Sequence, residues 1–173
     1  MSSSDNSERI MTKEEIRNTL SGGDRRSVGD AHLIAECLLQ KPELARSVVS
    51  LIQEDDAIVR SRAAHALKTA TLSKPAITQP YKSEFIQNMS PIQQWEVREQ
   101  FCIIITKLTL DSDDYTKCLN IFKDYLSDKS SIVRTCAMQG MSDLAEKSDS
   151  IKAEVLPVLI ELTETSSAAM RAR

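Results

Sequence analysis

The chain has 173 residues, of which 41% are hydrophobic, 27% charged and 4% aromatic, with only four glycines and five prolines. So few aromatic residues and turn formers exclude β-sandwiches and β-barrels, and the prevalence of Ala, Leu, Glu, Lys and Arg favours helices. The formal net charge of −3 excludes a global field that would attract DNA or an anionic membrane. The longest apolar runs, such as 101–105, are far too short to cross a bilayer.

Residues 1–11 are predicted to be a disordered polar tail, because they are rich in serine and lack the basic and apolar parts of a signal peptide. Residues 12–173 are predicted to form a single repeat domain. Its first helix opens at Thr12, where Glu15 completes a capping box, and it closes at the glycine-containing turn 21–24.

A short pattern, an apolar residue followed by arginine, recurs along the chain. The apolar residue falls at positions 59, 97, 133 and 170, so successive copies are 38, 36 and 37 residues apart. After each of the first three copies, residues at offsets of four, seven, eight and eleven are mostly apolar, which is the spacing of one buried face of an α-helix. This period is typical of arrays of helical hairpins.

Each copy is preceded, about nineteen residues earlier, by a partner helix. Proline at position 42 suits the first turn of a helix, and Asp111 caps the start of another. Pro157 is expected to kink the helix that contains it. The clearest interruption between repeats is 72–79. The partner helices are predicted over 42–53, roughly 80–89, 112–126 and 150–163.

Two stretches resemble a known family. Residues 54–67 (EDDAIVRSRAAHAL) and 128–138 (DKSSIVRTCAM) look like the turn and second helix of HEAT repeats. The resemblance covers most of the chain from about Ser27 onward, and the chain is most similar to small prokaryotic HEAT-repeat proteins. It implies an all-α fold of the armadillo-like type, an α-α superhelix in which four to five helical hairpins form a HEAT-like solenoid. For function it implies little, because such arrays serve scaffolds, transport receptors, phosphatase subunits, bilin lyases and a DNA glycosylase.

The resemblance also implies a structural role for the repeated arginines. In HEAT repeats an arginine at this place commonly pairs with an acid of the preceding turn, forming a ladder along the stack. Asp55 or Asp56 would serve the first arginine and Asp128 the third, whereas residues 90–93 offer the second no acid. The predicted ladder consists of Arg60, Arg98, Arg134 and Arg171.

In the family the second helices line the concave side, so equal offsets from each apolar-arginine pair form rows on that surface. Offset three holds Arg62, Gln100, Cys136 and Arg173; offset six holds His65, Ile103 and Gln139; offset nine holds Lys68, Thr106 and Ser142. These rows are mixed rather than basic, which favours a protein partner over nucleic acid. Exposed side chains that act as anchors for the partner are expected at Ile103, Met138 or Gln139. The predicted partner-binding residues are Arg62, His65, Lys68, Gln100, Ile103 and Gln139.

Nucleic-acid binding is the alternative function. The one dense basic patch is confined to a single repeat and consists of Arg60, Arg62, His65 and Lys68, with Arg25 and Arg26 expected nearby. A helical-repeat DNA glycosylase would need several aromatic side chains and an acid in its groove, and Trp95 is the only tryptophan.

Catalytic signatures are missing from the sequence, which contains no nucleotide-binding glycine motif, nucleophile elbow or H-E-x-x-H. The four cysteines form no C-x-x-C pair and are expected to be free thiols in a reducing cytosol, without a metal or cofactor. The sequence therefore predicts a non-catalytic, cytoplasmic interaction module that binds a protein partner through its concave face.

Overall fold

The computed structural model describes residues 10–165, and all of the regular structure in this range is helical. The chain divides into two compact units, Met1–Ile77 and Thr78–Arg173. The division falls inside the segment 72–79 that the sequence marks as an interruption between repeats. Most of the predicted tail over 1–11 lies outside the described residues, and the single repeat domain stays a prediction.

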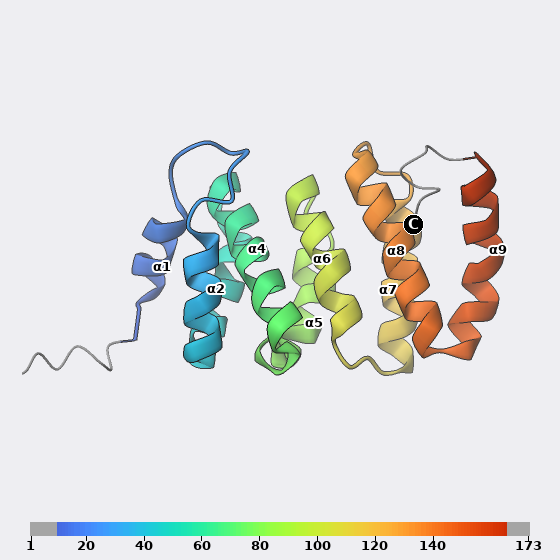
Figure 1. The fold of residues 1–173 in the computed structure, drawn as a ribbon, viewed down its shortest axis with the longest axis horizontal. Coiled ribbons are helices and arrows are strands. Elements are labelled where there is room, and N and C mark those ends of the chain that lie inside the picture. Colours follow the sequence, from blue (N-terminus) through green and yellow to red (C-terminus); the bar gives the residue numbers. More distant parts are fainter. Residues whose placement is uncertain (1–9, 166–173) are drawn as a thin grey trace, which may run out of the picture. The chain divides into compact units, whose positions relative to one another are not determined.

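The described part of the first unit consists of four α-helices and three short 3₁₀ turns. Its predicted capping box is confirmed, because the Glu15 amide donates to the Thr12 hydroxyl at 3.2 Å and the Thr12 amide donates to the Glu15 carboxylate at 2.8 Å. Helices α2 and α4 lie side by side (Figure 1). The sequence pattern did not assign α2. The elements are α1 Lys13–Leu20, α2 Ala31–Gln40, η1 Pro42–Leu44, α3 Ala45–Ser50, η2 Leu51–Gln53, α4 Ala57–Ser73 and η3 Pro75–Ile77.

In the second unit α8 packs against α6 on one side and α9 on the other, and it also packs against α7 (Figure 1). The predicted cap is confirmed: Asp111 accepts from the Asp114 amide at 2.9 Å at the start of α7. The elements are η4 Gln79–Tyr81, α5 Lys82–Glu84, η5 Phe85–Met89, α6 Trp95–Lys107, α7 Ser112–Tyr125, α8 Ser131–Lys147 and α9 Asp149–Thr165.

The helix predicted roughly over 80–89 is not a continuous α-helix. The chain passes from a 3₁₀ turn through one short α-helical turn into a π-helical turn, in which the Ser90 amide donates to the Phe85 carbonyl five residues earlier. This wider turn buries Phe85, Ile86 and Met89 together in the core of the second unit. Packing has overridden the regular period that the sequence pattern assumed.

The core of the second unit is built around three aromatic rings. Phe101 of α6 meets Phe122 and Tyr125 of α7 edge-on, with ring centroids 6.2 and 6.1 Å apart. Gly140 of α8 lies directly against the Phe122 ring, and a Cβ added to this glycine would be 2.7 Å from two of the ring carbons. The glycine is therefore required by the close approach of α7 and α8.

Replacing Gly140 by alanine should lower the free energy of unfolding by about 1–3 kcal/mol, because the fully buried ring has no room to move away. The loss should occur although alanine favours helices over glycine by about 1 kcal/mol. Urea unfolding followed by circular dichroism measures it. Phe122→Leu combined with Gly140→Ala should cost less than the sum of the two changes; strict additivity would contradict the predicted clash.

Candidate functional site

Three of the repeated arginines make the same backbone contact. Each guanidinium donates to the carbonyl oxygen six residues earlier, in the turn that precedes its own helix. A buried or half-buried carbonyl needs a donor, and the arginine supplies it where the helix cannot. The bonds run from Arg60 to Glu54 (2.7 Å), from Arg98 to Ile92 (2.9 Å) and from Arg134 to Asp128 (2.6 Å). Arg171 lies outside the described residues.

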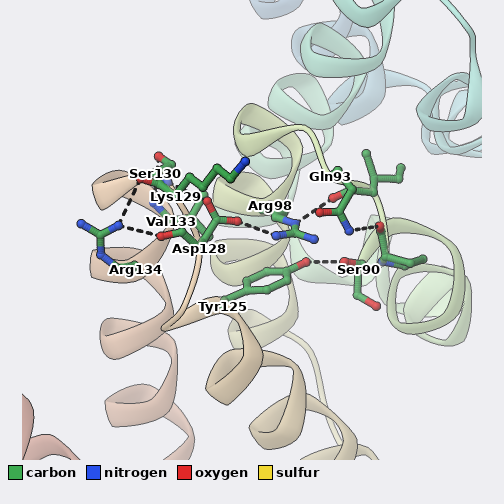
Figure 2. Close-up of polar contacts among 11 residues, drawn as sticks. Ser90, Gln93, Arg98, Tyr125, Asp128, Lys129, Ser130, Val133 and Arg134 are labelled. Atoms are coloured by element: carbon green, nitrogen blue, oxygen red, sulfur yellow. Dashed lines mark hydrogen bonds and ion pairs between the residues drawn. The ribbon is translucent and has the colours of Figure 1, made fainter.

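The acid partner expected for Arg134 serves another arginine instead. The Asp128 carboxylate binds Arg98, with Oδ2 and Nη1 2.5 Å apart, whereas Arg134 binds the backbone of the same turn (Figure 2). The second Asp128 oxygen accepts from the Ser130 amide at 2.7 Å. The acid that Arg98 lacks in its own turn therefore comes from the following repeat, 30 residues later.

Tyr125 completes this network. Its ring lies under the Arg98 guanidinium, 4.8 Å from the centroid, and its hydroxyl donates to the Ser90 carbonyl at 2.6 Å (Figure 2). Burial raises the pKa of Tyr125 above its usual value, so the phenol stays protonated and able to donate. Sequence reasoning missed Tyr125. The only available signal was its spacing of 35 residues from Ser90, close to the repeat period. The contacts among Ser90, Arg98, Tyr125 and Asp128 join one inter-helix turn to the next.

Arg62 is buried, with 4% of its surface exposed, so it does not present its charge on a surface row. Its guanidinium points into the loop that joins α1 to α2. A single side chain with five N–H donors satisfies backbone oxygens that no helix could pair. The acceptors are the carbonyl oxygens of Leu20 (3.0 Å), Ser21 (3.4 Å), Gly22 (2.7 Å), Asp24 (3.1 Å) and Ser27 (3.1 Å).

This placement weakens the basic patch on which nucleic-acid binding depends. Arg62 is enclosed, and His65 and Lys68 are half-buried. Burial, with a smaller contribution from Lys68, lowers the pKa of His65 below its usual 6.5, so this imidazole is neutral at pH 7. A surface that tracks phosphates needs several accessible cations. Nucleic-acid binding stays a prediction with little support from these residues.

Two of the predicted partner-binding residues, Ile103 and Gln139, line one cavity of about 360 Å³ between α6 and α8. Of the other expected residues on these helices, Gln100 is 6% and Met138 3% exposed, so neither offers a contact surface. The Gln100 amide oxygen is buried without a hydrogen-bond partner among the described residues. The full lining of the cavity is Glu99, Cys102, Ile103, Thr106, Lys107, Cys136, Gln139, Gly140 and Asp143.

The chemistry of this cavity is apolar at Ile103 and acidic on both helices. Asp143 of α8 accepts from the Gln139 amide at 2.8 Å, which holds the carboxylate on the cavity wall, and Glu99 lies on α6. Against these two carboxylates the lining has one amine, Lys107. The acidic excess of the chain also falls in residues 78–173, whereas residues 1–77 hold equal numbers of acidic and basic side chains.

None of the four cysteines forms a disulfide, and two of them, Cys102 and Cys136, line the same cavity. Burial and the neighbouring Cys136 raise the pKa of Cys102 well above its usual value, and burial raises that of Cys118 to about 12. Both buried thiols are therefore protonated and poor nucleophiles at neutral pH. Within residues 10–165, no three His, Cys, Asp or Glu side chains are placed to hold a metal ion.

Among the described residues, no helix combines the length and the apolar character that a bilayer span requires. Comparisons with known proteins add no relative: no family model, curated protein or solved structure matches this chain.

Proposed function

We propose that this chain is a non-catalytic, HEAT-type solenoid that binds a protein partner in the cytoplasm through the face formed by its second helices. The arginine contact repeated in three successive turns supports the repeat architecture, because one chemical device recurs at the repeat period. Four cysteines without a disulfide accord with a reducing compartment.

The observation that carries the proposal is the cavity between α6 and α8. It combines a half-buried apolar side chain, Ile103, with carboxylates on either side, and it lies on the helices that the repeat pattern assigns to the binding face. Binding hot spots are commonly apolar anchors surrounded by polar groups. The partner would insert an apolar side chain toward Ile103 and place a basic group near Asp143 and Glu99.

The test is selection of binders from a random peptide display library on the immobilised full chain. Selected peptides should carry Lys or Arg beside a large apolar residue. Ile103→Asp should weaken their binding about tenfold or more, which is the usual effect of losing an interface anchor. Asp143→Asn should weaken binding only of those peptides that carry the basic residue.

Ile132→Asp is the matched control, because Ile132 is 44% exposed on α8 and is not part of the cavity lining. Its binding should equal that of the unmodified chain. Circular dichroism establishes that each variant is folded. If no peptide is selected, or if Ile103→Asp binds as well as the unmodified chain, the proposed function is wrong.

A further inference from the structure

Helix α9 exposes two large apolar side chains, the first of which borders a groove of about 160 Å³ between α9 and α8. Leu156 is 51% and Ile160 is 52% exposed. The helix packs on α8 and α7 through the side on which Ile151 and Val155 are buried. The exposed pair is spaced by four residues and so lies together on the helix surface.

The repeat itself shows that Leu156 occupies a position that is normally covered. One repeat of 37 residues earlier, Leu119 of α7 is only 2% exposed, and the neighbouring pair of Cys118 and Val155 is buried in both helices. Helix α7 has packed neighbours in α8 and α9. The exposed ridge of α9 therefore has the composition of a helix face that is buried one repeat earlier.

The charges beside this apolar pair identify what covers it. Lys152, Leu156, Ile160 and Glu164 are all exposed and follow one another at intervals of four residues, which places them on one ridge of the helix. The ridge has a basic end, an apolar centre and an acidic end. When a second copy of the ridge is placed antiparallel to the first, its acid faces the lysine of the first copy and its lysine faces the acid. The apolar residues of the two copies then face each other. It is complementary to itself.

We propose that α9 is the contact surface for a second copy of this chain, in which two α9 helices pack antiparallel about a twofold axis. Leu156 of one copy meets Ile160 of the other, and Lys152 of one copy pairs with Glu164 of the other. Both contacts occur twice, as required when the same surface patch is used by both subunits. This inference is independent of the proposed function.

Sedimentation equilibrium of the full chain tests the proposal. The unmodified chain should show a concentration-dependent dimer. Leu156→Asp should raise the dimer dissociation constant about a hundredfold or more, because a carboxylate would be buried against the apolar centre. Leu72→Asp is the matched control, since Leu72 is 52% exposed on α4 and should leave the dimer unchanged. A monomer at every concentration up to about 1 mM, or a dimer insensitive to Leu156→Asp, would overturn the proposal.

Charge reversal distinguishes a second copy from any other occupant. Lys152→Glu and Glu164→Lys should each weaken the dimer about tenfold, because two attractive contacts become repulsive. Both changes place a favourable charge at their end of α9, so the helix itself should be retained. An equal mixture of the two single variants should form a heterodimer, since every contact again joins opposite charges, and the double variant should recover self-association. Failure of both combinations to associate better than the single variants would refute the antiparallel arrangement.

Discussion

Replacing Arg62 by methionine should lower the free energy of unfolding by about 3–5 kcal/mol, the largest effect expected for any single change in the first unit. Methionine retains an unbranched apolar stem but removes every donor. Five carbonyl oxygens of the loop 20–27, at 2.7 to 3.4 Å from the guanidinium nitrogens, would then have to find water or stay unpaired. Arg62→Lys should be nearly as unstable as Arg62→Met, because one ammonium group cannot reach acceptors that are arranged around a planar guanidinium.

The loop is also shaped to receive this side chain. Gly29 has a φ of 50°, and a Cβ at this position would be 2.7 Å from the Arg62 guanidinium carbon. Gly22 and Gly23 have φ of 73° and 77°, in the left-handed region that favours glycine. The loop conformation and the arginine are therefore mutually dependent, and losing the arginine should release the loop before the rest of the unit.

Urea unfolding and amide hydrogen exchange together measure the effect of Arg62→Met. Amide exchange should accelerate throughout the unit and also locally at the Ser27 amide, which donates to the Asp24 carbonyl at 3.0 Å. Arg26→Met is the control, because Arg26 is exposed in the same loop and its replacement should change stability by less than about 0.5 kcal/mol. Equal stability of Arg62→Met and the unmodified chain would contradict the assigned role.

Replacing Asp128 by asparagine should cost about 2–4 kcal/mol, because it leaves the Arg98 charge enclosed without a counter-ion. The side chains of Arg98 and Asp128 are only 13% and 8% exposed, so solvent screens the pair weakly. Asparagine keeps an acceptor for the Ser130 amide, so the change isolates the loss of charge. The carbonyl that binds Arg134 belongs to the backbone and is retained.

A double-mutant cycle separates this pair from its surroundings. Arg98→Met combined with Asp128→Asn should be less destabilising than the sum of the single changes by about 1–3 kcal/mol. Tyr125→Phe should cost about 1 kcal/mol, since it removes one hydrogen bond to Ser90 and keeps the ring under Arg98. Asp124→Asn, at an exposed position of α7, is the control for loss of a carboxylate. A coupling energy near zero would show that the contact between Arg98 and Asp128 contributes nothing.

Both experiments concern arginines that the repeat pattern singled out, but whose contacts it did not predict. The repeat pattern singled out Arg98 and Arg62, yet it placed Arg62 on a surface and offered Arg98 no acid. An apolar period indicates which face of a helix is buried, but it does not indicate how far a long polar side chain extends from the edge of that face. Among the surface predictions, Ile103 and Gln139 share a cavity, whereas Gln100 and Met138 are buried.

The sequence alone determined most of the helices, two of their N-terminal caps and the repeat period, but not α2 or the irregular turns over 79–89. Thr12 and Glu15 cap α1, Asp111 and Asp114 cap α7, and the period of about 37 residues returns in the arginine contacts, because each of these depends on residues within a few positions of one another. Only the tertiary structure decided which oxygen each arginine reaches. Arg62 binds carbonyls 35 to 42 residues away and Arg98 a carboxylate 30 residues away, and such partners become neighbours only after the helices have packed.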